Sequence, residues 1–276
     1  MNRPTPIVLL VMLAWSSLIM SQQKLNPKIT KDIPVMDTTP VFTVEIWSDI
    51  VCPFCYLGKR KFEEALAQFE NADQVRVVWK SFQLNPDVMT DTSISVYQHL
   101  SRSKGITEEV AQQMAEGVTQ RAKEAGLNYD FDKAVVANTY RAHCLLHLAK
   151  EHGMQNTMKE RLLKAYFIEG MNVDDPDVLV KLGTEVGLNA QEISEKLSSD
   201  AFRPEVEEDM DLAQRFGIRG VPFFVFDRKY AVSGAQESPV FLQTLERSFE
   251  EWKKANPAAE LKITEGAQCT PDKKCD

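Results

Sequence analysis

The pattern of apolar residues between positions 41 and 82 changes from strand-like to helix-like and back. Residues 41–47 are rich in β-branched and aromatic side chains, which is typical of a β-strand, and Ser48-Asp49 ends the run. From Cys52 to Phe69 the apolar side chains recur at helical spacing, and residues 75–82 again predict a strand. The order strand, helix, strand predicts a parallel βαβ unit.

The middle of the chain, from about Ser93 to Asp200, has a different pattern. Apolar residues recur there at helical intervals in blocks that glycines separate, so we expect five or six helices and no strand. A further helix should begin near Pro204 and end at Gly217. Strand patterns return at residues 221–226 and 230–233, which a three-residue connection joins as a hairpin, and a last helix should follow over 238–254.

The strands at the two ends of this pattern need one another to complete a sheet. Because the helical block lies between them, we expect one α/β domain over residues 41–256 with a large inserted α-helical domain at about 88–202. Residues 257–276 are a polar tail with two cysteines. A net charge of -8 and scattered Lys and Arg residues argue against a nucleic-acid partner.

The first 21 residues differ from the rest of the chain. A positive charge precedes an uncharged, mostly apolar run over residues 7–20, and polar residues follow it. This pattern is typical of a signal peptide, since the run is shorter than the roughly 20 residues that span a bilayer. We therefore expect a signal peptide at 1–21 that meets the membrane only transiently, a leader at 22–40, and a periplasmic or otherwise exported protein. The alternative is a cytoplasmic protein whose translation starts at Met20 or Met36.

The segment Cys52-Pro53-Phe54-Cys55 lies where a predicted strand ends and a predicted helix begins. Free backbone N–H groups and the helix macrodipole give that helix end a partial positive charge, which stabilises a thiolate. We therefore expect Cys52 to be an exposed nucleophile with a lowered pKa, and Cys55, one turn further along, to resolve the mixed disulfide. Pro53 suits the first helical position and Phe54 shapes the surface beside the sulfur, so both are candidate substrate-binding residues. No cofactor is predicted.

A Cys-x-x-Cys pair can also be half of a zinc site, which needs further ligands. Cys144 with His143 and His147 is the candidate set, because the two histidines share one helix face. Cys144, however, lies in an apolar helical run, where a buried thiol is the common state. We therefore predict no metal site and keep a metal-binding dithiol protein as a non-enzymatic alternative.

Several segments carry a resemblance to a known family. They are Glu45–Arg60, Gly217–Phe226 and Val232–Gln236, with Asn138-Thr139 and Ala142-His143 in the helical middle. Over roughly Val41 to Trp252 the chain resembles the FrnE-like branch of the DsbA thiol–disulfide oxidoreductase family. The resemblance implies a thioredoxin-like fold, with a central mixed sheet, flanking helices and an inserted helical domain that caps the redox site. It also implies that Cys52 attacks, that Cys55 resolves, and that the dithiol exchanges disulfides with protein substrates.

Gly220-Val221-Pro222 begins a strongly apolar predicted strand, where a proline needs a reason. In thioredoxin-type folds a cis-proline lies beside the active disulfide. A cis Val221–Pro222 bond would turn the Val221 backbone toward the thiols, where its N–H and C=O can pair with an extended substrate chain. We therefore expect Pro222 to be a catalytic cis-proline and Val221 to bind substrate. A trans proline on an edge strand is the alternative.

Four further residues are candidates for supporting roles. Glu45 and Asp49 are possible proton acceptors for Cys55, because a partly buried carboxylate can take a thiol proton; a surface acid at a strand edge is the other interpretation of Glu45. Cys269 and Cys275 look like the extra C-terminal pair of some FrnE-like members. They are either a second redox pair or a structural clip.

Protein disulfide exchange, with an unidentified redox partner that recycles the dithiol, is thus the function that the sequence favours. A glutathione-dependent isomerase or transferase of the same fold is the second candidate. Enzymes of that kind lack the second cysteine, so the intact Cys52 and Cys55 pair argues against it.

Overall fold

The computed structural model describes residues 40–257. The predicted signal peptide at 1–21, the leader up to residue 39, and the tail with Cys269 and Cys275 lie outside the described residues. Within 40–257, no helix is both long and apolar enough to cross a membrane. The N-terminal elements are β1 (Phe42–Ser48), α1 (Pro53–Gln68), the short 3-10 helix η1 (Ala72–Gln74) and β2 (Val75–Ser81); the C-terminal elements are α8 (Arg203–Arg215), β5 (Phe223–Phe226), β6 (Tyr230–Ser233) and α9 (Ser238–Ala255).

The main sheet draws its strands from both ends of the described chain, in the order β2-β1-β5-β6. β1 and β2 are parallel over their whole length, which confirms the predicted βαβ unit. β5 pairs with β1 in antiparallel register, and β6 completes the hairpin with β5. The mixed sheet with helices on its faces is the thioredoxin-like fold that the resemblance implies.

Each face of this sheet is covered by different helices. On one face, Val44 and Ile46 of β1 pack with Phe62 of α1 and Phe241 of α9. On the other face, Trp47 packs with Ala213 of α8. Because side chains alternate along a strand, β1 supplies both cores in turn and is buried almost throughout.

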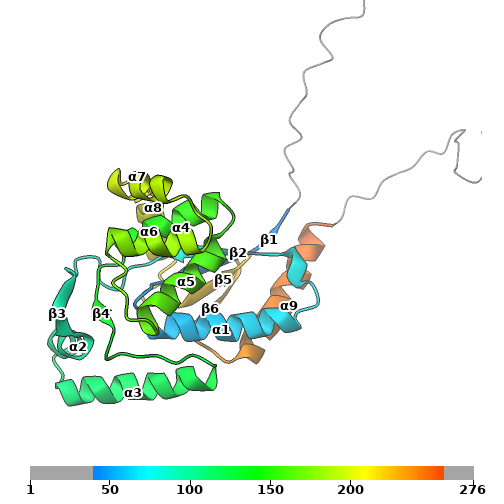
Figure 1. Ribbon diagram of the computed structural model, residues 1–276. Helices are drawn as coiled ribbons and strands as arrows, with labels where there is room; N and C mark the ends of the chain where they lie inside the picture. The colour runs from blue at the N-terminus through cyan, green and yellow to red at the C-terminus, as the bar shows by residue number, and fades with distance from the viewer. Residues whose placement is uncertain (1–39, 258–276) are drawn as a thin grey trace, which may run out of the picture. The chain divides into compact units, whose positions relative to one another are not determined.

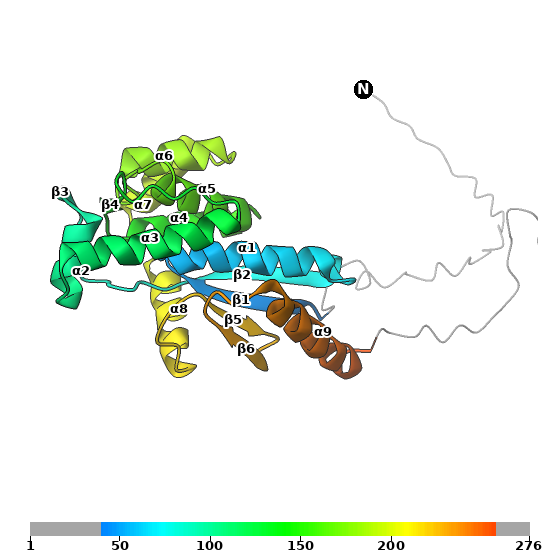
Figure 2. The same cartoon turned by 90° about the horizontal axis from the view of Figure 1, so that it is seen from below.

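The insertion between β2 and α8 is mainly helical. In both views α4, α6 and α7 lie together on one side of α1, while α2 lies at the end of the fold away from α9 (Figure 1 and Figure 2). Ile50 and Tyr56, from the start of α1 and the turn before it, belong to the insertion's own core. The insertion therefore packs directly on the helix end that carries the cysteines. Its elements are β3 (Asp91–Ser95), α2 (Val96–Lys104), α3 (Glu108–Glu124), β4 (Val135–Val136), α4 (Tyr140–Glu151), α5 (Gln155–Phe167), α6 (Pro176–Glu185) and α7 (Ala190–Ser198).

The prediction that the insertion contains no strand is wrong. β3 and β4 pair as a small antiparallel sheet with an irregular register. β3 has the sequence Asp-Thr-Ser-Ile-Ser and β4 has only two residues, so neither shows the apolar alternation by which a strand is recognised. Ser95 at the end of β3 also caps α2 through a capping box with Gln98, and that helix-start signal masks the strand.

Candidate active site

The turn between β1 and α1 places the two cysteines. Asp49 follows the strand, and its carboxylate accepts a hydrogen bond of 2.7 Å from the Ile50 N–H. Cys52 is the N-cap residue of α1 with an extended backbone, and Pro53 occupies the first turn. The Cys55 N–H donates to the Cys52 carbonyl at 3.0 Å. Both cysteines are free thiols, so the structure represents the reduced dithiol.

The expectation that Cys52 is exposed is wrong, although Cys52 does line a cavity. Cys52 is only 4% exposed and Cys55 is fully buried, because the insertion packs over the start of α1. Cys52 lines a cavity of about 1000 Å³, whereas Cys55 does not. A substrate in this cavity therefore meets Cys52 before Cys55, which is the order that attack by Cys52 and resolution by Cys55 require.

The charge distribution within the pair also differs from the sequence prediction. A hydrogen bond with Cys55 and burial together raise the pKa of Cys52. Burial also disfavours a charge on Cys55, but the hydrogen bond from Cys52 and the nearby Lys159 ammonium outweigh it and lower the pKa of Cys55. The two thiols are therefore electrostatically linked, because a negative charge on one disfavours a charge on the other.

The segment before β5 lies against Cys52. The Val221–Pro222 peptide bond is cis, and the Cys52 thiol donates to the Val221 carbonyl at 3.4 Å. Pro222 is held in place because its carbonyl accepts a 2.8 Å hydrogen bond from the Gly234 N–H. A Cβ on Gly58 would lie 2.9 Å from the Pro222 ring, so only glycine at this position of α1 allows the close approach.

Pro53 and Phe54 lie beside the dithiol on the cavity wall. The Pro53 carbonyl accepts a hydrogen bond of 2.8 Å from the Tyr129 hydroxyl, which ties the start of α1 to the insertion. Phe54 is 39% exposed, and the Arg121 guanidinium lies 5.5 Å from its ring centre. The cavity wall thus combines apolar side chains with a cation, and Met114, Leu84 and Val221 also line it.

Of the two candidate proton acceptors, Asp49 lies next to the dithiol. The Cys52 N–H points to the Asp49 carbonyl at 3.4 Å, and the carboxylate accepts a 2.8 Å hydrogen bond from the Leu84 N–H. Its Oδ1 lies 3.4 Å from Nε2 of His143, which is fully buried. Although burial opposes it, the contacts with His143 and the Leu84 N–H lower the pKa of Asp49, so this carboxylate is ionised at neutral pH.

Glu45 has other partners, and the structure does not favour it as the acceptor. Its carboxylate forms a bidentate ion pair with Arg228 at 2.8 and 2.9 Å, and Lys80 lies 3.9 Å away. Glu45 shares the face of β1 that carries Trp47 toward α8, because side chains two residues apart point the same way. The core of α1 packs on the opposite face.

The residues proposed as further zinc ligands also serve different partners. His147 Nε2 lies 3.1 Å from the Ser81 hydroxyl and 3.3 Å from an Asp209 oxygen. Cys144 is buried, and burial raises its pKa to about 11. Within residues 40–257, no three His, Cys, Asp or Glu residues are grouped to hold a metal ion.

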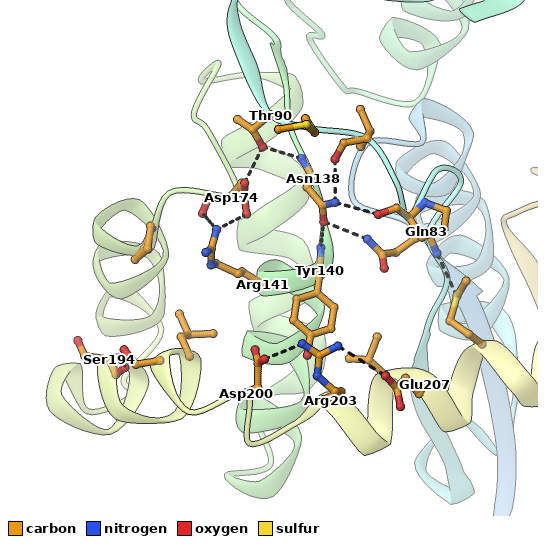
Figure 3. A pocket seen from close by; sticks show the side chains of 18 of the residues that line it. Gln83, Thr90, Asn138, Tyr140, Arg141, Asp174, Ser194, Asp200, Arg203 and Glu207 are labelled. Atoms are coloured by element: carbon orange, nitrogen blue, oxygen red, sulfur yellow. Dashed lines mark hydrogen bonds and ion pairs between the residues drawn. The ribbon is translucent and has the colours of Figure 1, made fainter.

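Asn138 holds one wall of the cavity at Cys52, although the sequence alone did not indicate this role. Its side-chain amide donates to the carbonyls of Pro86 and Val88, and its side-chain oxygen accepts from Gln83 (Figure 3). Asn138 and Val88 also border a second cavity of about 1150 Å³ on the far side of this wall. Leu84, Asn85 and Val88 line the cavity at Cys52, so the amide holds in place a segment that faces the thiol.

Comparisons with known proteins show the family and the fold of this chain. The DSBA-like thioredoxin domain model matches residues 43–246. A crystal structure of a probable DsbA oxidoreductase, SCO1869 from Streptomyces coelicolor, superposes with a TM-score of 0.70 at 37% identity and covers 85% of this chain and 98% of that one. The uncharacterized protein YwbO of Bacillus subtilis is 28% identical over 207 residues, which is 72% of this chain and 92% of YwbO.

A more distant structure shares the fold. The cytosolic disulfide reductase DsbM from Pseudomonas aeruginosa has a TM-score of 0.54 at 17% identity and covers 76% of this chain and 99% of DsbM. Because the family model spans most of the domain that carries Cys52 and Cys55, the chain belongs to the DSBA-like thioredoxin domain family of oxidoreductases.

Proposed function

We propose that this protein exchanges disulfides with protein substrates through Cys52 and Cys55. The observation that carries the proposal is the position of Cys52. It lies at the N-cap of α1, at the wall of a cavity of about 1000 Å³, and its thiol contacts the Val221 carbonyl. The FrnE-like branch is the part of the family to which we assign it.

The chemical step is a thiol–disulfide exchange in two stages. The Cys52 thiol loses its proton to solvent, and its sulfur attacks the substrate disulfide. A Cys52–substrate disulfide forms, and one substrate sulfur leaves as a thiolate. Cys55 then loses its proton to that thiolate and attacks the Cys52 sulfur, which breaks the mixed disulfide. The pair thus gives two electrons and one proton to the substrate, and oxidation of a substrate dithiol is the reverse.

Protein chains are the substrates that the wall of the cavity fits. The backbone of Val221 lies beside Cys52, where it can pair with an extended peptide, and Phe54, Leu84 and Met114 offer apolar contacts. Glutathione is the competing substrate, since Arg121 on the same wall suits a carboxylate. The presence of both sulfurs favours a complete two-cysteine exchange over the glutathione-dependent isomerase chemistry.

The exported location is also proposed here. A secreted enzyme meets an oxidising compartment and would act as an oxidant or isomerase, whereas translation from Met20 or Met36 would give a cytoplasmic reductase. We also propose that an unidentified redox partner recycles the dithiol, and that Cys269 and Cys275 form either a second redox pair or a structural clip.

Reduction of insulin by dithiothreitol tests the proposed function. The wild-type protein should accelerate insulin precipitation, and Cys52→Ser should abolish the acceleration. Cys144→Ser is the matched control, because Cys144 is a buried free thiol that does not line the cavity at Cys52. Equal rates for wild type and Cys52→Ser would remove the redox function, and one equivalent of zinc by elemental analysis would favour the metal-binding alternative.

A further inference from the structure

We propose that the second cavity, on the far side of the wall that Asn138 holds, is a docking site for a basic segment of the substrate protein. The inference rests on the proposed function, because it names the kind of chain that reaches the dithiol. The second cavity measures about 1150 Å³, and residues of α4, α6, α7 and α8 line it opposite the wall (Figure 3).

The wall between the two cavities is apolar and held in place. Val88 lines both cavities, while Leu84 lines the one at Cys52 and Met89 lines the second. Met89 is 84% exposed, and Leu84 is also exposed. Neighbouring exposed apolar side chains mark binding surfaces, and methionine adapts to partners of different shape. A substrate chain whose cysteine lies at Cys52 can therefore continue over Val88 into the second cavity.

The second cavity has an acidic lining. Five carboxylates and two guanidinium groups contribute to it. Figure 3 shows that both arginines are already paired: Arg141 lies 2.8 Å from an Asp174 oxygen, and Arg203 lies 2.6 Å from Asp200 and 3.6 Å from Glu207. An incoming anion would have to compete with these carboxylates, whereas an incoming cation would not.

The other two carboxylates have no cationic partner. Asp177, in the first turn of α6, and Asp211, on α8, are exposed, and no basic nitrogen of residues 40–257 lies within 4.0 Å of either one. Apolar side chains such as Val180 and Leu197 line the same cavity. A lysine or arginine side chain has an apolar stem and a charged end, so this combination fits a basic residue.

The cavity at Cys52 has the opposite charge pattern. Lys104 and Arg121 line it, and among the residues that the structure describes no carboxylate oxygen lies within 4.0 Å of either cation. Asp49 also lines it, but this residue is only 1% exposed and its carboxylate already accepts hydrogen bonds from two backbone N–H groups. A preference for basic residues must therefore come from the second cavity, away from the substrate cysteine.

The proposal predicts which of two peptides reacts faster. Each peptide has a central cysteine between uncharged residues, with two lysines or two glutamates at each end, and is supplied as its symmetric disulfide. In Cys55→Ser, the Cys52 thiol loses its proton to solvent and its sulfur attacks a peptide sulfur. The peptide S–S bond breaks, one peptide leaves as a thiolate, and the other stays bound to Cys52. The lysine peptide should react about threefold to tenfold faster, as two exposed ion pairs allow, and high salt should reduce this preference.

The experiment compares three full-length proteins that all carry Cys55→Ser. They are the parent, a variant with Asp177→Asn and Asp211→Asn, and a matched control with Glu246→Gln and Glu250→Gln. The control glutamates are exposed on α9 and line neither cavity, so both variants change the net charge equally at different places. Acid-quenched samples analysed by mass spectrometry give the rate of adduct formation. The expected preference for the lysine peptide is kept in the parent and the control, and falls below about twofold in the aspartate variant.

Each other outcome has an assigned meaning. Equal rates for the two peptides in the parent, an unchanged preference in the aspartate variant, or the same loss in both variants would overturn the inference. Sedimentation detects a dimer that the aspartate substitutions break without changing the preference; the cavity would then bind a second copy of this chain, which would also overturn it. If the double aspartate variant does not fold, Asp211→Asn alone replaces it. If neither peptide forms an adduct on Cys52, the proposed function fails; if both react without preference, the docking role fails alone.

Discussion

Replacing Gly58 by alanine tests the close approach between α1 and Pro222 on which the site geometry depends. The added Cβ would lie 2.9 Å from the Pro222 ring, 3.4 Å from the Phe224 ring and 3.5 Å from the Ala235 side chain. The proline ring is rigid, and a hydrogen bond from Gly234 holds its carbonyl. The strain therefore falls on the contact between α1 and the segment that carries Val221.

Two opposing free energies set the expected size of the effect. Alanine is favoured over glycine inside a helix by about 1 kcal/mol. Overpacking a tight contact costs about 1–3 kcal/mol. Gly58→Ala should thus change the free energy of unfolding by between about zero and 2 kcal/mol, in the destabilising direction.

Gly117→Ala is the matched control, because Gly117 is also inside a helix but a Cβ there would meet nothing within 4 Å. It should be about 1 kcal/mol more stable than wild type, so the difference between the two variants isolates the strain at Pro222. Denaturant unfolding measures both variants, and insulin reduction should be slower for Gly58→Ala because Val221 moves relative to Cys52. Equal stabilisation of the two variants, with exchange unchanged in Gly58→Ala, would refute the reasoning.

Two other contacts lead to equally direct predictions. Arg60, Lys59 and Tyr56 hold the pKa of Glu160 at about 2 against its ordinary value of 4.5, despite the opposing effect of burial. Because that pKa is lowered in the folded state, the stabilisation is complete above about pH 4.5 and is lost as the pH falls toward 2. Glu160→Gln should therefore cost up to about 3 kcal/mol near neutral pH, and denaturant unfolding should show the gap from wild type closing in acid; a gap independent of pH would contradict this. Asn138→Ala should cost about 1–2 kcal/mol, since it removes the partly buried hydrogen bond to the Val88 carbonyl and the exposed one to the Pro86 carbonyl. It should also slow insulin reduction by loosening the cavity wall, and an unchanged rate would contradict a role of this wall in the exchange.

The elements that carry the cysteines are predictable from the sequence because their patterns are strong and local. β1 is rich in β-branched and aromatic residues and is almost wholly buried, and the first turn of α1 is marked by Pro53. The mixed sheet was predictable because the strands at the two ends of the domain, β1 and β2 on one side and β5 and β6 on the other, need one another to complete a sheet. The pair β3 and β4 was not predictable, because β3 is mostly polar, β4 has only two residues, and the two strands are far apart in sequence.

The electrostatics of the site depend on contacts that no local pattern encodes. The burial of Cys52 results from the insertion, and Lys159, about a hundred residues away, is one of the groups that lower the pKa of Cys55. One signal was present: Lys159 shares a helix face with Leu163 and Tyr166, which are apolar positions, and a lysine in such a stripe is rarely free of a specific partner. Glu45, by contrast, was a reasonable candidate until Arg228, which lies in a hairpin turn, was seen to pair with it.

Trapping the mixed disulfide tests most directly whether Cys52 attacks the substrate and Cys55 resolves the intermediate. Cys55→Ser and Cys52→Ser are each incubated with a peptide disulfide, quenched with acid and analysed by mass spectrometry. The cavity at Cys52 and the burial of Cys55 predict a stable mixed disulfide on Cys52 in Cys55→Ser, and no adduct in Cys52→Ser. An adduct on Cys55, or none on either variant, would contradict the account.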